Sequence, residues 1–202
     1  KATSNICTAQ ALLAIMASMY AVYHGPARLV EIAEDISKQA HDLANALEEL
    51  GYPIKHTSYF DTICFESNNV ERLVQTAADQ GMNIFGRNGH VMISVDETTS
   101  NKDLNNLIKV FADVSGVEST TINHSNTTGF PGNLERQSTF LTHPIFNSHQ
   151  SETDMMRYIK SLENKDISLT RSMISLGSCT MKLNAASELY PISNPQFANL
   201  HP

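Results

Sequence analysis

The stretch Asn83-Ile84-Phe85-Gly86-Arg87-Asn88-Gly89-His90-Val91-Met92-Ile93-Ser94-Val95 holds two apolar runs on either side of Arg87-Asn88-Gly89. Because asparagine and glycine both accept a positive φ, Asn-Gly between two strands is the strongest short-range signal for a β-hairpin. Strands that come as hairpins form an antiparallel sheet, whereas βαβ units form a parallel one. The sequence therefore predicts an α+β fold in which helices cover an antiparallel sheet.

The segments on either side of the hairpin supply the other elements of this layer. Period-two patterning predicts strands at residues 54–59 and 62–66, joined at Phe60-Asp61. Helical spacing returns at residues 70–78, and Gly81 suits the end of that helix. A last helix is expected to begin at a capping residue, to bury one apolar face and to end at a glycine. The caps are Thr98, Thr99 or Ser100, the face is Leu104, Leu107, Ile108 and Phe111, and the glycine is Gly116.

The first fifty residues predict two helices separated by His24-Gly25-Pro26. Glycine suits the C′ position of the first helix, and proline suits the first turn of the second. The first helix begins around residues 6–9, and its apolar positions are too dense to leave a polar face, so we expect burial on most sides. The second helix, residues 27–50, has one apolar stripe and closes at Gly51. The apolar positions of the first helix are Leu12, Leu13, Ile15, Met16, Met19, Tyr20, Val22 and Tyr23.

Composition divides the chain into three parts. Residues 1–116 carry the α+β layer, and residues 117–139 are rich in Ser, Thr, Asn and Gly, which predicts an exposed, mobile linker and a domain boundary. A second structured part, residues 140–202, is expected to be largely helical or irregular. Within it, Ser151-Glu152-Thr153-Asp154 resembles a capping box that opens a helix. That helix is lined by Met155, Met156, Ile159 and Leu162, and Pro191, Pro195 and Pro202 predict irregular chain beyond it.

Charge and cysteine usage exclude several function classes. The chain has 202 residues, a formal net charge of -7 and a pI of about 5.5, which argue against nucleic acid or an anionic membrane as the main partner. The most apolar run, residues 9–23, is short for a bilayer crossing, and no signal-peptide pattern opens the chain. Three cysteines without a C-x-x-C pair disfavour a disulfide framework and indicate a reducing compartment. Because the chain opens at Lys1 beside a helix and stops at Pro202, we expect a piece of a longer polypeptide.

One polar stretch, Leu176-Gly177-Ser178-Cys179-Thr180-Met181-Lys182-Leu183-Asn184, is too rich in polar groups for a helix or strand to bury. Its chemistry leaves two interpretations open. Backbone N–H groups beside the glycine, the hydroxyls and the ammonium form an anion cradle. Alternatively, the stretch is a polar turn in front of a helix at residues 184–189.

Histidine and cysteine spacing limits the other candidate chemistry. His143 and His149 are six residues apart and cannot act as metal ligands at i and i+4 of one helix, so no metal site is expected. A Cys–His nucleophile pair lacks a supporting sequence signature. Cys7, at a predicted helix N-terminus, is a candidate redox-responsive thiol because the positive end of the helix dipole lowers a thiol pKa.

Three long segments resemble the P-protein family of the glycine cleavage system, the glycine decarboxylases that depend on pyridoxal 5'-phosphate (PLP). They are residues 1–13 with their continuation 19–26, residues 141–152, and the polar stretch 176–184. The three occur in the family's order and span nearly the whole chain. The resemblance implies that residues 1–116 are the small C-terminal domain of a fold-type I PLP enzyme, in the cofactor-free first half of the protein. Residues 140–202 would then open the second half.

The resemblance also implies an activity, partners and site residues. The full enzyme would release CO2 from glycine and transfer the aminomethyl group to the lipoyl arm of the H-protein. The lysine that anchors PLP would lie outside this chain, in the second half of the same polypeptide, so the fragment itself would be inactive. Ser178, Thr180 and Lys182 would help hold the cofactor, and Thr142, His143, Asn147, His149 and Cys179 would lie near the active site.

Two further expectations follow from the same resemblance. The full enzyme would be a homodimer, cytoplasmic in a bacterium and in the mitochondrial matrix in a eukaryote. The alternative, from another function class, is a non-catalytic structural or binding module that supports the PLP-bearing half.

Overall fold

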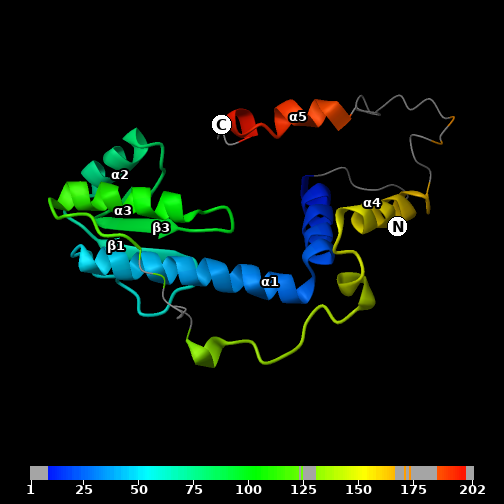
Figure 1. The fold of residues 1–202 in the computed structure, drawn as a ribbon, viewed down its shortest axis with the longest axis horizontal. Coiled ribbons are helices and arrows are strands. Elements are labelled where there is room, and N and C mark those ends of the chain that lie inside the picture. The colour runs from blue at the N-terminus through cyan, green and yellow to red at the C-terminus, as the bar shows by residue number, and fades with distance from the viewer. Residues whose placement is uncertain are drawn as a thin grey trace. The chain divides into compact units, whose positions relative to one another are not determined.

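The computed structural model describes residues 9–122, 124, 131–166, 171, 173 and 186–198. The chain forms two compact units, Lys1–Asn147 and Ser148–Pro202, and each is considered by itself. The first unit contains a mixed layer of helices and strands (Figure 1). The predicted α+β class is confirmed at this level, because helices accompany a small antiparallel sheet.

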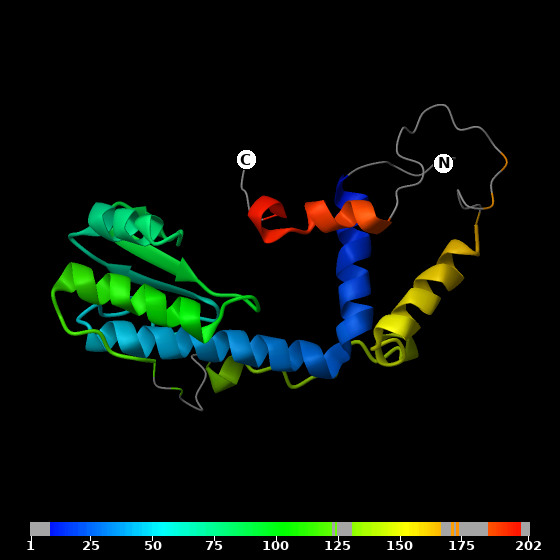
Figure 2. The same cartoon turned by 45° about the horizontal axis from the view of Figure 1, so that its top comes forward.

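The long helix α1, Ala9–Glu49, consists of two arms joined at Gly25. Gly25 has φ 66° and ψ 175°, a backbone region that is essentially restricted to glycine. Pro26 follows in the first turn of the second arm, where its missing N–H is not needed. We call residues 9–24 the first arm and residues 26–49 the second arm; they meet at a sharp bend (Figure 2). The predicted break between two helices is confirmed.

The second arm ends in a Schellman motif, as its glycine predicts. Gly51 has a φ of 87°, and its N–H donates to the Glu48 carbonyl at 3.0 Å. The Tyr52 N–H donates to the Leu47 carbonyl at 2.9 Å. These two bonds satisfy carbonyls that a helix end otherwise leaves without partners.

The sheet has three strands, β1 (Thr62–Glu66), β2 (Phe85–Arg87) and β3 (His90–Ser94), in the order β1-β3-β2. Both pairings are antiparallel. The turn between β2 and β3 places Asn88 at φ 53° and Gly89 at φ 78°, so the predicted Asn-Gly hairpin is confirmed.

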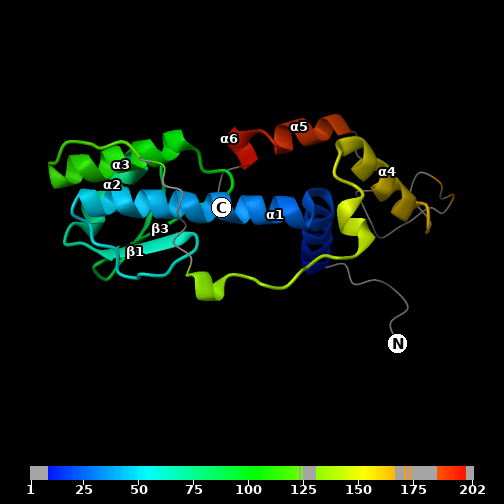
Figure 3. The same cartoon turned by 60° about the horizontal axis from the view of Figure 1, so that its bottom comes forward.

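One face of the sheet packs on helices, and this contact forms the core. Ile63, Phe65, Val91 and Ile93 point inward and are buried, whereas the residues between them face outward. The second arm and helix α3 (Asn101–Ser115) lie on the inner side (Figure 3). Buried positions of these helices complete the core: Leu43, Leu47, Leu104, Ile108 and Phe111.

An aromatic cluster joins three elements of this core. The rings of Tyr52, Phe65 and Phe111 lie 5.2–5.6 Å apart between centroids, at the tilted or edge-on angles that aromatic pairs prefer. The buried Tyr52 hydroxyl donates to the Phe111 carbonyl at 3.2 Å. The end of α1, strand β1 and α3 are therefore tied together at one point.

Local sequence signals also set the ends of the two shorter helices. Helix α2, Val70–Asp79, is followed by Gly81 at φ 76°. Helix α3 begins at Ser100, which forms a full capping box with Asp103, and ends at Gly116 with φ 72°. The predicted cap and both predicted glycine ends are confirmed.

Two expectations for the first unit are wrong. Residues 54–59 do not form a strand: Ile54 makes a single bridge to Phe65, and Tyr59 instead approaches His41 of α1, with 3.1 Å between Oη and Nδ1. The polar run between these two residues has no apolar side chain to keep it on the sheet. The first arm is not buried, because Leu12 and Leu13 are 60% and 62% exposed. The described residues of the predicted linker are mostly exposed, as expected, but Ile122 is buried in the core.

The second unit contains helix α4 (Glu152–Glu163), a 3-10 turn (Ala186–Glu188) and two short helices, α5 (Leu189–Ile192) and α6 (Pro195–Ala198) (Figure 3). Ser151 caps α4 and accepts the Asp154 N–H, so the predicted helix start is confirmed. The irregular chain expected around Pro191 and Pro195 is wrong, because α5 and α6 contain them. A proline in the first turn of a helix removes no intrahelical hydrogen bond.

Candidate functional site

Three of the predicted site residues lie in a short loop at the end of the first unit. Thr142, His143 and Asn147 are all exposed, and the 3-10 turn Pro144–Asn147 packs against α1. The loop is closed from within, because the Asn147 side-chain amide donates to the Leu141 carbonyl at 3.5 Å. Leu141 has a φ of 49°, which is unusual for a residue other than glycine. The loop therefore holds a specific backbone shape that presents polar side chains outward.

The hydrogen bonds of His143 select one tautomer of its imidazole. The Ile145 N–H donates to Nδ1 at 3.2 Å, so Nδ1 carries no proton in this arrangement. The proton of the neutral ring then sits on Nε2, the nitrogen on the far side of the ring. An exposed Nε2–H donor suits a carboxylate or phosphate oxygen, which is the role this residue can fill chemically.

His149 belongs to the second unit and has a different environment. Its ring stacks on Tyr158 of α4, with 4.4 Å between the ring centroids and 13° between the planes. This contact fixes the ring beside the cap of α4. The structure thus assigns the two predicted histidines to separate units, and their grouping at one site stays a prediction.

The other predicted site residues lie outside the described residues. These are the proposed cofactor-binding residues Ser178, Thr180 and Lys182, the neighbouring Cys179, and the redox candidate Cys7. Their roles therefore stay predictions.

A charged cluster on the outer face of the sheet was not predicted from the sequence. Lys55 hydrogen-bonds both Glu66, with 3.0 Å between Nζ and Oε1, and the Nε2 of His90. His90 Nδ1 lies 2.9 Å from the Asn88 carbonyl oxygen and donates to it, which leaves Nε2 free to accept the lysine proton. The hydrogen bond from Lys55 is the main cause that lowers the pKa of Glu66, and the positive charge of Lys55 adds to it.

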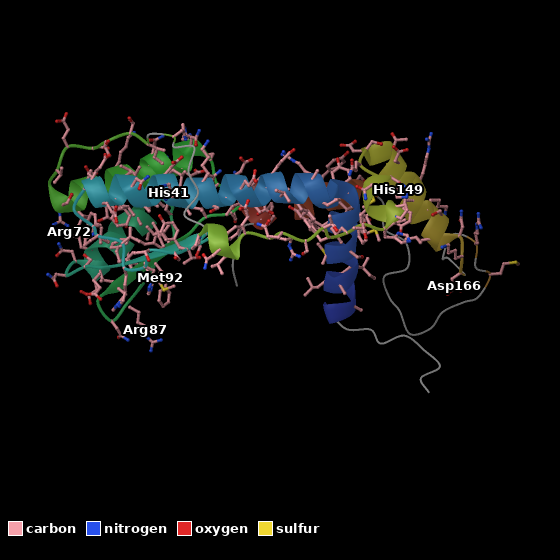
Figure 4. The ribbon with its side chains drawn as sticks, turned by 90° about the horizontal axis from the view of Figure 1, so that it is seen from below. His41, Arg72, Arg87, Met92, His149 and Asp166 are labelled. Atoms are coloured by element: carbon pink, nitrogen blue, oxygen red, sulfur yellow. The ribbon has the colours of Figure 1, made fainter. Side chains whose placement is uncertain are left out.

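The strand register explains why the sequence did not reveal this cluster. Glu66 lies opposite His90 in the β1–β3 pair, and Arg87 lies opposite the same residue from β2. Arg87 and Met92 of this face point away from the helices (Figure 4). Alternating patterning indicates which face a residue occupies, but not which residue of another strand it meets.

A cavity of about 870 Å³ lies between the second arm and residues 132–140. The Arg136 guanidinium lies 5.3 Å from the centre of the Phe140 ring on one wall. On the helix wall, the buried Ser37 hydroxyl has no hydrogen-bond partner among the described residues. The cavity carries both signs of charge, from Glu34, Asp35, Lys38, Glu135 and Arg136, so its lining selects no single class of ligand.

Within the part of the chain that the structure describes, no group of three His, Cys, Asp or Glu side chains could hold a metal ion. Among the same residues, no helix is both long and apolar enough to cross a membrane.

Comparison with known proteins gives a match that covers most of the first unit. Residues 1–111, just over half of the chain, match the sequence profile described as "Glycine cleavage system P-protein". The chain belongs to the glycine cleavage system P-protein family. The family resemblance found in the three sequence segments is thereby confirmed.

Similarity to individual family members extends over the whole chain. It is 53% identical to a glycine dehydrogenase (decarboxylating) of Christiangramia forsetii, and 50% identical to proteins of the same name from Flavobacterium johnsoniae and Deinococcus radiodurans. Each match covers 100% of this chain but 21% of the relative. The chain thus spans about a fifth of the length of these P-protein family members.

Proposed function

We propose that this chain is part of a glycine dehydrogenase (decarboxylating). The observation that carries the proposal is the 53% identity, along the complete chain, to a protein of that name. Under this proposal the full polypeptide binds PLP, releases CO2 from glycine and transfers the aminomethyl group to the lipoyl arm of the H-protein. When bound, PLP supplies the electron sink for loss of the carboxylate.

The residues of this chain would bind and orient groups around the cofactor. The proposal gives Ser178, Thr180 and Lys182 the task of holding an anionic group, because hydroxyls and an ammonium are suitable donors to phosphate or carboxylate oxygens. His143 supports such a role from the described part, since its Nε2–H is exposed and its tautomer is held by the Ile145 N–H. No lysine here is proposed as the covalent anchor of PLP.

The test uses the full-length polypeptide with Lys182→Ala and Ser178→Ala. Loss of one charge-assisted hydrogen bond corresponds to roughly 1.5–3 kcal/mol, so Lys182→Ala should weaken PLP binding by about 10- to 100-fold. Lys165→Ala removes a lysine of equal charge from the exposed end of α4 and serves as the control. Unchanged PLP affinity and glycine turnover in both variants would contradict the assignment of these residues.

A second candidate function is a non-catalytic module that supports the PLP-bearing part of the polypeptide. The observation in its favour is that the described residues of the first unit form a hydrophobic core, in which Leu43, Leu47 and Phe111 are buried. The two functions differ in the effect of Lys182→Ala and Ser178→Ala in the full-length polypeptide, because a purely supporting module would leave PLP affinity unchanged. Under both functions, we expect the 202-residue chain alone to release no CO2 from glycine with added PLP.

A further inference from the structure

The first arm of α1 has an unusual surface for an exposed helix. From residue 9 to residue 23 it carries no charged side chain. Five of its large apolar side chains are 40–62% exposed: Leu12, Leu13, Ile15, Met16 and Tyr20. With 100° between successive helical residues, these five lie on one half of the helix circumference. A contiguous exposed apolar surface of this kind marks a contact that the described residues of the first unit do not supply.

The opposite half of the first arm is also suited to contact. It presents the small residues Ala11, Ala14, Ala17 and Ser18, all of which are exposed. Small side chains allow another element to approach the helix backbone closely. A helix that docks on a single partner surface keeps a charged, solvated back, and the first arm has none. Both halves of the first arm are therefore suited to burial against other parts of a protein.

We propose that the first arm is an interior helix of a further domain, enclosed on both halves by parts of the same polypeptide that lie outside these 202 residues. The relatives have room for such a domain, because the chain spans 21% of their length. A second copy of the chain seated on the arm would cover one half and leave the other in water. The proposal rests on family membership and on this length, and it does not depend on the proposed activity.

The bend at Gly25 separates the part of α1 that packs in the first unit from the part that we propose to be buried elsewhere. The second arm is committed to the core of the first unit, through Leu43 and Leu47. The bend at Gly25 directs the first arm out of that core. The same helix would thus serve two hydrophobic cores, with the glycine at the division between them.

The test compares thiol labelling in the 202-residue chain and in the full-length polypeptide. Met16→Cys reports on the large apolar half of the arm, and Ala14→Cys on the small-residue half. Glu31→Cys, at an exposed charged position of the second arm, is the matched control. Labelling by a maleimide is followed at each position by mass spectrometry of peptides, so the native cysteines stay in place.

Both arm positions should react as exposed thiols in a dilute solution of the 202-residue chain. In the full-length polypeptide, both should react at least about a hundredfold more slowly, because an interior thiol reacts only when the structure opens locally. Amide hydrogen exchange of residues 9–23 in the unsubstituted proteins should show the same protection, which guards against a variant that folds poorly.

Three outcomes would overturn the proposal. Fast labelling of both positions in the full-length polypeptide would show an exposed arm. Protection of Met16→Cys alone would show a partner seated on one half. Protection that already appears in the 202-residue chain and grows with its concentration would show self-association of two copies.

Discussion

The two arms of α1 place their leucine side chains in opposite environments. Leu43 and Leu47 of the second arm are completely buried, whereas Leu12 and Leu13 of the first arm are mostly exposed. The second arm also carries charged residues on its outer side, such as the Arg28–Glu31 ion pair, and the first arm carries none. The second arm has one apolar stripe, and the first unit buries it. The first arm has no polar face, and the first unit leaves most of its large apolar side chains exposed.

The sharpest test of this contrast truncates one leucine in each arm. Leu47→Ala should lower the free energy of unfolding of the 202-residue chain by about 2–5 kcal/mol, because it leaves a cavity in the core. Leu13→Ala should change it by less than about 0.5 kcal/mol, because the side chain is 62% exposed. Urea denaturation followed by circular dichroism measures both. Equal losses for the two variants would mean that the first arm is buried in this chain.

The joint between the arms is the next place to test the comparison. Gly25→Ala places a Cβ in a backbone region that only glycine adopts readily, at a cost of about 1–3 kcal/mol. Gly132→Ala is the matched control, since a Cβ at Gly132 meets open space and its φ is not positive. Unfolding midpoints of the two variants give the difference. If Gly25→Ala were as stable as the control, the arms would not meet through a strained glycine.

A smaller effect is expected where α3 supports the second arm. Ser100→Ala removes the N-cap of α3 and should cost about 1 kcal/mol of unfolding free energy. Ser151→Ala removes the equivalent cap of α4 in the other unit and should leave the unfolding of the first unit unchanged. Tryptophan is absent, so the rings of Tyr52 and other tyrosines report unfolding by near-ultraviolet circular dichroism. Identical shifts in the two variants would show that the units unfold together.

The same cap should also make the free energy of unfolding of the first unit depend on pH. Hydrogen bonds from the Ser100 hydroxyl and then its backbone N–H lower the pKa of Asp103. Because the folded pKa lies below the unfolded one, the stabilisation is present above the usual aspartate value of about 4 and is lost as the pH falls through the folded pKa. Asp103→Asn cannot titrate, so its stability deficit relative to the unchanged chain should shrink on acidification below about pH 4.

A deficit that stayed constant from neutral pH to below pH 4 would contradict this linkage. Glu66→Gln is a second test, on the outer face of the sheet, where the hydrogen bond from Lys55 lowers the pKa of Glu66. Its stability deficit should also shrink on acidification. Glu66 is paired with the charged Lys55, whereas the neutral donors of Ser100 hold Asp103, so added salt should reduce the contribution of Glu66 more than that of the cap.

Local signals predicted the parts of the fold that depend on single residues. The bend at Gly25, the hairpin at Asn88-Gly89 and the cap at Ser100 each follow from the backbone conformation that the residue favours. The environment of the first arm was predicted wrongly, because its pattern describes a burial that this chain does not provide. Whether a pattern is satisfied depends on neighbours, and the described residues of the first unit leave Leu12 and Leu13 exposed.

The candidate site was less predictable than the fold. The resemblance selected His143, but its tautomer depends on the Ile145 N–H, which follows from the 3-10 turn. The pairing of Glu66 with His90 depends on strand register, which alternation alone does not set. Single-residue signals carry little information about such contacts between distant segments.

The isolated bridge at Ile54 has a further consequence, for the behaviour of the sheet in a crowded solution. In the order β1-β3-β2, strand β1 is an edge, and an unpaired edge strand is a template for joining other molecules into larger sheets. The bridge of Ile54 to Phe65, with the Lys55 N–H donating to the Cys64 carbonyl, occupies part of that edge. Strand β2 at the other edge has only three residues and ends in Arg87. Ile54 and Lys55 do not belong to a strand, but by pairing with β1 they help to protect the sheet from aggregation.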